Sequence, residues 1–62
     1  MKNGEKVYVS GEVEYGDNVY RIACNGVIQD IGDKESLVTL DNIDGDGRAT
    51  VFVLNKYIDK LN

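Results

Sequence analysis

The chain has 62 residues, a formal net charge of −4, one cysteine and no histidine. A chain of this length forms one domain with a thin core, which leaves little room for a deep catalytic cleft. The lone cysteine excludes an internal disulfide, the usual zinc ligands are missing, and 11 acidic against 7 basic residues disfavour nucleic-acid binding. We therefore expect a single cytoplasmic domain over residues 1–62 that is not an enzyme and has no cofactor, no metal, no signal peptide and no membrane span.

Residues 6–15 alternate between apolar and polar side chains. Val7, Val9, Val13 and Tyr15 share one parity, and Glu12 lies on the other. A period of two predicts a strand with one buried face. Gly11 stands in the middle of this strand, where a glycine predicts a bulge or a sharp bend.

The stretch 12–31 predicts two hairpins that share a middle strand, residues 20–24. The first turn is Gly16-Asp17-Asn18, with Val19 in the loop. The second turn is Asn25-Gly26, because Asn-Gly between β-type runs is the strongest short hairpin signal.

A pairing of Tyr15 with Tyr20 matches the side chains of the first hairpin. It places Arg21 between Glu14 and Asp30 on the outer face, where opposite charges favour the register.

The same register leaves a conflict of phase further along the chain. It puts Gln29 on the core face, opposite Ile22, and Ile28 outside. We expect a bulge within residues 26–31 to correct the phase, although packing of Ile28 on a second surface is the alternative.

Residues 37–41 and 48–54 predict the fourth and fifth strands, with a turn-rich loop between them. Apolar residues occupy both parities of this pair, which predicts burial on both faces or a covered outer patch. Residues 55–57 predict one helical turn, and residues 58–61 a short closing strand. Five short antiparallel strands in meander order predict a small all-β barrel, whose closure removes exposed sheet edges.

The loop 41–47 resembles part of an EF-hand calcium loop. If Asn42 stands first, Asp44 and Asp46 take ligand positions, but Val53 stands at the twelfth position, where calcium needs a bidentate glutamate. A hairpin loop whose Asp and Gly residues serve turn geometry explains the same sequence, and we favour it over a weak cation site.

Tyrosines and carboxylates are the candidate contact residues. Tyr8 lies on the polar parity of the first strand, whereas the parity of Tyr15 indicates the core or its rim. The chain carries no phosphate-binding glycine motif and no histidine-based nucleophile pair, so catalysis has no candidate residues. Tyrosine supplies contact area at protein interfaces, and carboxylates complement a basic partner. An ordinary half-exposed strand tyrosine is the alternative interpretation of Tyr8. We predict a partner-binding surface formed by Tyr8, Glu12, Glu14, Tyr15, Asp17 and Tyr57.

Residues 49–61 resemble the last strand, one-turn helix and closing strand of SH3-like barrels. Asn55, Tyr57 and Ile58 stand where SH3 domains carry an Asn-Tyr-Val segment, with one residue inserted. Residues 4–7, and 26–28 followed by 37–40, are also similar to KOW-type barrels. The resemblance implies a five-stranded SH3-like barrel. The chain lacks the Ala-Leu-Tyr-Asp-Tyr run and the tryptophan with which SH3 domains bind proline-rich peptides, and only Tyr57 and the acidic segment Glu12, Glu14 and Asp17 resemble parts of that groove.

Together these features predict a protein-interaction module, a monomer or weak homodimer, with a protein partner that is basic where the carboxylates contribute. Such short acidic domains are common among bacterial and phage accessory proteins. One alternative is an acidic inhibitor that mimics nucleic acid, which requires carboxylates gathered on one face. Another is oligomerisation through the last two strands. A KOW-like nucleic-acid surface is a further alternative, and it requires a basic patch at Lys6, Arg48, Lys56 and Lys60.

Overall fold

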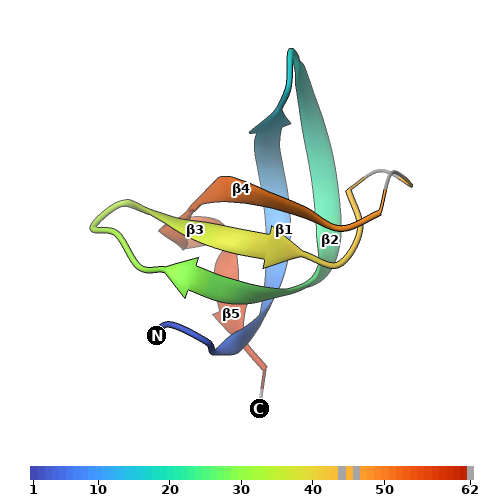
Figure 1. Cartoon of the computed structure of the whole chain (residues 1–62). Coiled ribbons are helices and arrows are strands. Elements are labelled where there is room, and N and C mark those ends of the chain that lie inside the picture. Colours follow the sequence, from blue (N-terminus) through green and yellow to red (C-terminus); the bar gives the residue numbers. More distant parts are fainter. Residues whose placement is uncertain (44, 46, 62) are drawn as a thin grey trace.

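The computed structural model describes residues 1–43, 45 and 47–61. Within them the elements are β1 (Lys6–Tyr15), β2 (Asn18–Asp30), β3 (Glu35–Leu40), β4 (Ala49–Leu54), the 3-10 turn η1 (Asn55–Tyr57) and β5 (Ile58–Lys60). All strand pairs are antiparallel, and they form one sheet in the order β4-β3-β2-β1-β5 (Figure 1). The predicted all-β fold with five strands and a helical turn at residues 55–57 is confirmed. The first four strands follow in meander order, and β5 returns to the other side of β1.

The long strand β2 curls the sheet. Its residues 18–27 pair with β1, and its residues 26–30 pair with β3. Figure 1 shows β2 running from the upright β1–β2 hairpin into the layer that β3 and β4 form. The sheet therefore bends over a common core but does not close. Because β4 and β5 remain its two edges, the predicted closure of the barrel is wrong.

Asn25 and Gly26 lie inside β2, so the predicted second hairpin is wrong. Gly26 is buried, and a Cβ at this position would stand 2.8 Å from the carbonyl oxygen of Thr39 and 3.0 Å from Cγ1 of Val38. The glycine is required because β3 approaches β2 closely here, not because the chain turns. The strand predicted after this turn is the second half of β2.

The turn between β1 and β2 contains only Gly16 and Asp17, and it is shorter than predicted. Tyr15 pairs with Asn18 across the hairpin, and the φ of 64° at Gly16 is the positive value that two-residue hairpin turns require. The predicted pairing of Tyr15 with Tyr20 is therefore wrong by two residues. An even shift keeps every side chain on its expected face.

The shorter turn gives Arg21 a different partner. Arg21 stands opposite Glu12, and its Nη2 atom lies 3.5 Å from Oε2 of Glu12. The predicted position of Arg21 between Glu14 and Asp30 is wrong, since Asp30 pairs with Leu37 on β3.

The expected conflict of phase at Ile28 and Gln29 does not arise. Because β2 continues without a turn, Ile28 keeps the inward parity of Ile22 and is fully buried, whereas Gln29 is exposed. The predicted bulge is present between Ile28 and Asp30, but it follows Ile28 and does not change the face of that side chain.

Gly11 lies in an uninterrupted part of the β1–β2 pairing, opposite Ile22. Of the two features predicted at this glycine, a bulge or a sharp bend, the bulge is wrong. A Cβ at Gly11 would overlap the ring of Tyr57, so the glycine leaves room for an aromatic ring instead.

The core lies between the two layers of the curled sheet. The predicted inward parity of β1 is confirmed for its three valines, whereas Tyr15, predicted on the same parity, is exposed. Strand β4 alternates strictly between buried and exposed residues, so the prediction of burial on both of its faces is wrong. The buried apolar side chains are Val7, Val9, Val13, Ile22, Ile28, Val38, Leu40, Ile43, Ala49, Val51, Val53 and Ile58.

Within the described residues no helix is long and apolar enough to span a membrane.

The loop between β3 and β4 is anchored in the core by Ile43, which is fully buried. The backbone N–H of Ile43 donates to the carbonyl oxygen of Gly47, and the N–H of Gly47 donates to Oδ1 of Asn42. The candidate calcium ligands Asp44 and Asp46 lie outside the described residues.

Candidate functional site

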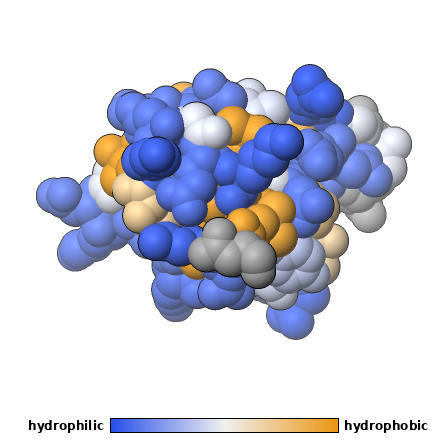
Figure 2. Space-filling model, turned by 90° about the horizontal axis from the view of Figure 1, so that it is seen from below, coloured by the Kyte–Doolittle hydropathy of each residue, from blue (hydrophilic) through white to orange (hydrophobic). Residues whose placement is uncertain are grey.

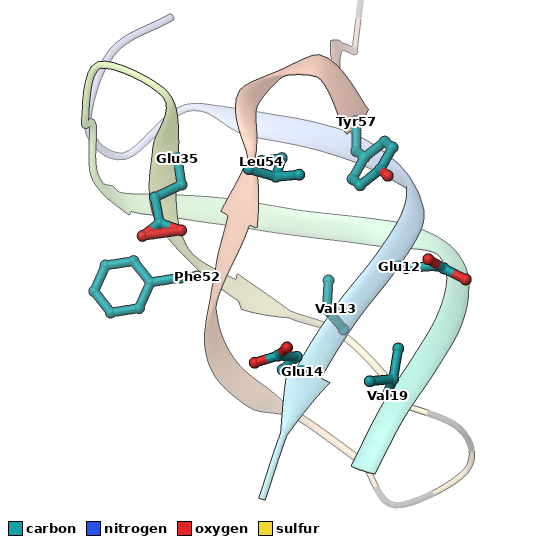
Figure 3. Close-up of a pocket in the computed structure, with 8 residues that line it drawn as sticks. All are labelled: Glu12, Val13, Glu14, Val19, Glu35, Phe52, Leu54 and Tyr57. Atoms are coloured by element: carbon teal, nitrogen blue, oxygen red, sulfur yellow. The ribbon is translucent and has the colours of Figure 1, made fainter. Parts of the chain in front are cut away.

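A groove of about 600 Å³ lies between the β1–β2 hairpin and β4 (Figure 3). The hairpin forms one wall, β4 and the start of β3 form the other, and η1 closes one end. Carboxylates and exposed apolar side chains share this groove. Its lining residues are Glu12, Val13, Glu14, Val19, Glu35, Phe52, Leu54 and Tyr57.

The hairpin wall takes its side chains from the outer face of β1 and β2. Glu12 stands opposite Arg21, and Glu14 stands opposite Val19, so these four side chains share one face. The ion pair of Glu12 and Arg21 is solvated, because the exposed fractions of the two side chains are 55% and 84%. It therefore adds little stability, and a competing cation replaces Arg21 at a small cost in free energy. Among the described residues no lysine or arginine lies within ion-pair distance of Glu14.

The β4 wall presents Phe52 and Leu54, which are 61% and 40% exposed. The neighbouring Val51 and Val53 are buried, so the inner face of β4 holds the strand in place while the outer face stays accessible. Glu35, at the start of β3, pairs with Leu54 of β4 and adds a carboxylate to this wall. An exposed phenylalanine beside a second apolar side chain marks a surface that can bury area against a partner.

The ring of Tyr57 forms the η1 end of the groove. It is half-buried and packs against Gly11 and the edge of the core. Nζ of Lys56 lies 5.3 Å from the centre of this ring. A cation therefore already lies at the tyrosine ring, as a cation–π contact requires.

A small hydrogen-bond network holds η1 against the β2–β3 loop. The buried hydroxyl of Ser36 donates to Oδ1 of Asn55 at 2.7 Å, and Nδ2 of Asn55 donates to the carbonyl oxygen of Gly32 at 2.9 Å. The N–H of Asn55 also donates to the carbonyl oxygen of Lys34 at 2.8 Å. Ser36 and Lys34 flank Glu35, and Asn55 begins the turn η1 that carries Tyr57. The network therefore ties the two segments that hold these groove residues to each other.

Of the predicted contact residues, Glu12, Glu14 and Tyr57 line the groove. Asp17 lies in a second hollow of about 190 Å³ at the hairpin tip, which shares Glu14 with the groove. The two remaining predicted tyrosines lie elsewhere.

Tyr15 is exposed and packs on Tyr20, with ring centroids 6.5 Å apart and planes inclined by 49°. Tyr8 stands between Asn25 and Asp59, nearer the start of β1. Neither ring lines the groove.

Five further residues line the groove but were not among the predicted contact residues: Val13, Val19, Glu35, Phe52 and Leu54. Apolar residues on both parities of residues 48–54 signalled an outer patch, and Phe52 and Leu54 form it, but it is exposed rather than covered. Val19 was predicted to lie in a loop, although it belongs to β2. Glu35 carries no local signal, since only the curl of β2 brings the start of β3 to this groove.

The four basic residues of the KOW-like hypothesis do not form one continuous patch. Lys6 and Lys60 come from the neighbouring strands β1 and β5, where Val7 pairs with Lys60. Arg48 precedes β4 and Lys56 follows it, so the length of the strand, roughly 20 Å, separates them.

Figure 2 shows the molecule from below, relative to the view of Figure 1. Figure 2 shows hydrophilic side chains over most of this face, and apolar residues reach its surface in separate areas among them. The acidic and apolar side chains of the groove instead meet in one depression. The groove is therefore the stronger candidate for a binding site.

Among the described residues the structure also places potential metal ligands and the single cysteine. Within residues 1–43, 45 and 47–61, no group of three His, Cys, Asp or Glu side chains is placed to hold a metal ion. Cys24 is a free, half-buried thiol that packs against the core.

The chain matches no protein-family model, no curated protein and no solved structure.

Proposed function

We propose that this chain is a non-enzymatic protein-interaction module with an SH3-like barrel fold, and that its groove binds a basic segment of a partner protein. The observation that carries the proposal is the meeting of Glu12, Glu14 and Glu35 with Phe52 in one groove. The return of β5 to β1 after the 3-10 turn η1 supports the proposed fold.

The mixed character of the groove favours a protein partner. Protein interfaces combine aromatic and aliphatic anchors that lose water with a polar rim that sets specificity. Phe52 and Leu54 supply exposed apolar area, and the half-buried ring of Tyr57 adds a rigid aromatic surface beside them. A short partner segment that lies along β4 contacts all three side chains.

The charge of the groove favours a basic segment. Glu12, Glu14 and Glu35 line it, and the whole chain has a net charge of −4. Complementary charge speeds association and rejects acidic competitors, even where each exposed ion pair adds little affinity.

A nucleic-acid mimic is the second candidate, and the gathering of three glutamates in the groove favours it. A mimic of phosphates needs carboxylates, but it has no need of an exposed phenylalanine between them. Phe52 therefore favours the protein-interaction module over the mimic.

The test is a titration of the isotope-labelled protein with a peptide of alternating lysine and valine, followed by amide chemical shifts. We expect shifts at Phe52, Leu54 and Tyr57. The triple variant Glu12→Gln, Glu14→Gln, Glu35→Gln should bind about tenfold more weakly, since three exposed charge contacts are lost. The effect should shrink as salt is added.

The matched control is Asp30→Asn, Asp41→Asn, Asp59→Asn, which changes the net charge equally at exposed residues outside the groove. We expect less than about a twofold change in affinity, because only distant, screened charges differ. Equal losses in the two triple variants would show that the peptide responds to net charge and that the groove is not the site.

A further inference from the structure

We infer that the basic segment binds as an added β-strand, hydrogen-bonded along the free edge of β4. This inference rests on the proposed function and specifies the backbone conformation of the partner in the same groove. The partner segment is extended, and its own N–H and C=O groups take part in recognition.

The direction of the backbone groups of β4 follows from one hydrogen bond. The N–H of Asn55 donates to the carbonyl oxygen of Lys34, so this pair is a hydrogen-bonded pair of the β3–β4 ladder. Hydrogen-bonded and non-hydrogen-bonded pairs alternate along an antiparallel ladder. The register from Leu54 to Ala49 has no shift, so the N–H groups of Phe52 and Leu54 point away from β3.

The side chains of Thr39 and Thr50 agree with this assignment. Their Oγ1 atoms lie 2.8 Å apart, and the two residues stand directly opposite each other. Side chains approach most closely in non-hydrogen-bonded pairs. Since Thr50, Phe52 and Leu54 share one parity, all of them direct backbone groups to the free edge.

The free edge of β4 borders the groove. Within the described residues β4 pairs only with β3, and Phe52 and Leu54 both line the groove. A strand added about 4.8 Å from β4 places alternate side chains beside Phe52 and Leu54. On its other side it meets the hairpin wall, where Glu12 and Glu14 are positioned to accept lysine or arginine side chains.

The sequence of β4 lacks the features that protect a sheet edge. Natural edge strands carry charged residues, proline or a bulge, which discourage the pairing of further strands. β4 reads Ala-Thr-Val-Phe-Val-Leu, and its register with β3 is regular. This edge is therefore suited to accept another strand.

Charge decides which strand the edge accepts. A second copy of this chain brings a net charge of −4 to a groove that three glutamates already line. Like charges across adjacent strands are destabilising. A basic segment of a partner protein has the complementary charge, so it is the occupant we infer.

Leu54→Pro tests the hydrogen bonds directly. Leu54 has φ −61° and ψ 133°, which fits proline, and its N–H is not used by β3. The variant should keep its fold and lose one edge donor. Leu54→Val is the matched control, because valine has as many side-chain carbons as proline and keeps the N–H. With the lysine–valine peptide, we expect Leu54→Pro to bind about three- to tenfold more weakly than Leu54→Val.

Amide hydrogen exchange in the unsubstituted chain provides a second measurement, which does not depend on how Leu54→Pro folds. The Phe52 amide should exchange more slowly when the peptide is bound. Equal affinities of the two variants, or unchanged Phe52 exchange while groove shifts persist, would overturn strand addition and leave the proposed function standing. No groove shift with any concentration of peptide would overturn both. Concentration-dependent protection of Phe52 without peptide would assign the edge to a second copy and overturn the inference.

Discussion

The two ends of the β1–β2 hairpin differ in how they are held. At the base, Val7, Val9 and Ile28 are fully buried between the layers of the sheet. At the tip, Tyr15 and Val19 are exposed, and the tip stands away from the rest of the sheet in Figure 1. The base therefore carries stability, and the tip region, which includes the hairpin wall of the groove, is left for contact with a partner.

The largest difference between the two ends should appear on truncation of apolar side chains. Ile28→Ala at the base should cost about 2–5 kcal/mol of unfolding free energy, because it leaves a cavity in the core. Val19→Ala at the tip should cost less than about 0.5 kcal/mol, because its side chain is 62% exposed. Urea denaturation measures both values. Similar costs would show that the tip is packed as firmly as the base.

Between the ends, Gly11 tests whether the ring of Tyr57 couples the hairpin to η1. Gly11→Ala places a Cβ where the ring now lies, so we expect a loss of about 1–3 kcal/mol from overpacking. In a Tyr57→Ala background the same substitution should cost at least about 1 kcal/mol less, because the overlap is gone. Thermal or urea denaturation of the four proteins completes the cycle. Additive effects would mean that the ring does not rest on Gly11.

The smallest effect concerns the ion pair near the tip. Arg21→Ala should change the unfolding free energy by less than about 0.5 kcal/mol, since Arg21 and Glu12 are both largely exposed. It also releases the Glu12 carboxylate, so the lysine–valine peptide should bind up to about twofold more tightly. Lys6→Ala removes an equal charge outside the groove and is the control. A stability loss above about 1 kcal/mol would mark the pair as structural.

Alternation of apolar residues predicted the inward face of β1 because one buried face imposes a period of two. The Asn25-Gly26 pair led to a wrong hairpin prediction, because glycine occurs both in turns and where two strands approach closely. The carbonyl oxygen of Thr39, which lies against Gly26, shows that close approach is the reason here. The register of the first hairpin was off by two residues, because faces alone do not distinguish even shifts.

Only some residues of the candidate site could be predicted from the sequence. Glu12 and Glu14 stood out by charge, and Tyr57 by its resemblance to a residue of the SH3 groove; all three line the groove. Glu35 and Phe52 reach the groove because β2 curls and brings the β3–β4 layer opposite the hairpin. That curl depends on contacts between residues far apart in the sequence, which no local pattern contains.

The pairing of β5 with β1 also has a kinetic consequence. Val9 pairs with Ile58, so the last ladder joins segments separated by most of the chain. Contacts of such long sequence separation slow folding, because the intervening loop loses entropy before the contact forms. During synthesis, β1 to β4 leave the ribosome first, and one edge of β1 stays unpaired until residues 58–60 emerge. The nascent chain thus passes through a stage with an open sheet edge that the finished protein covers.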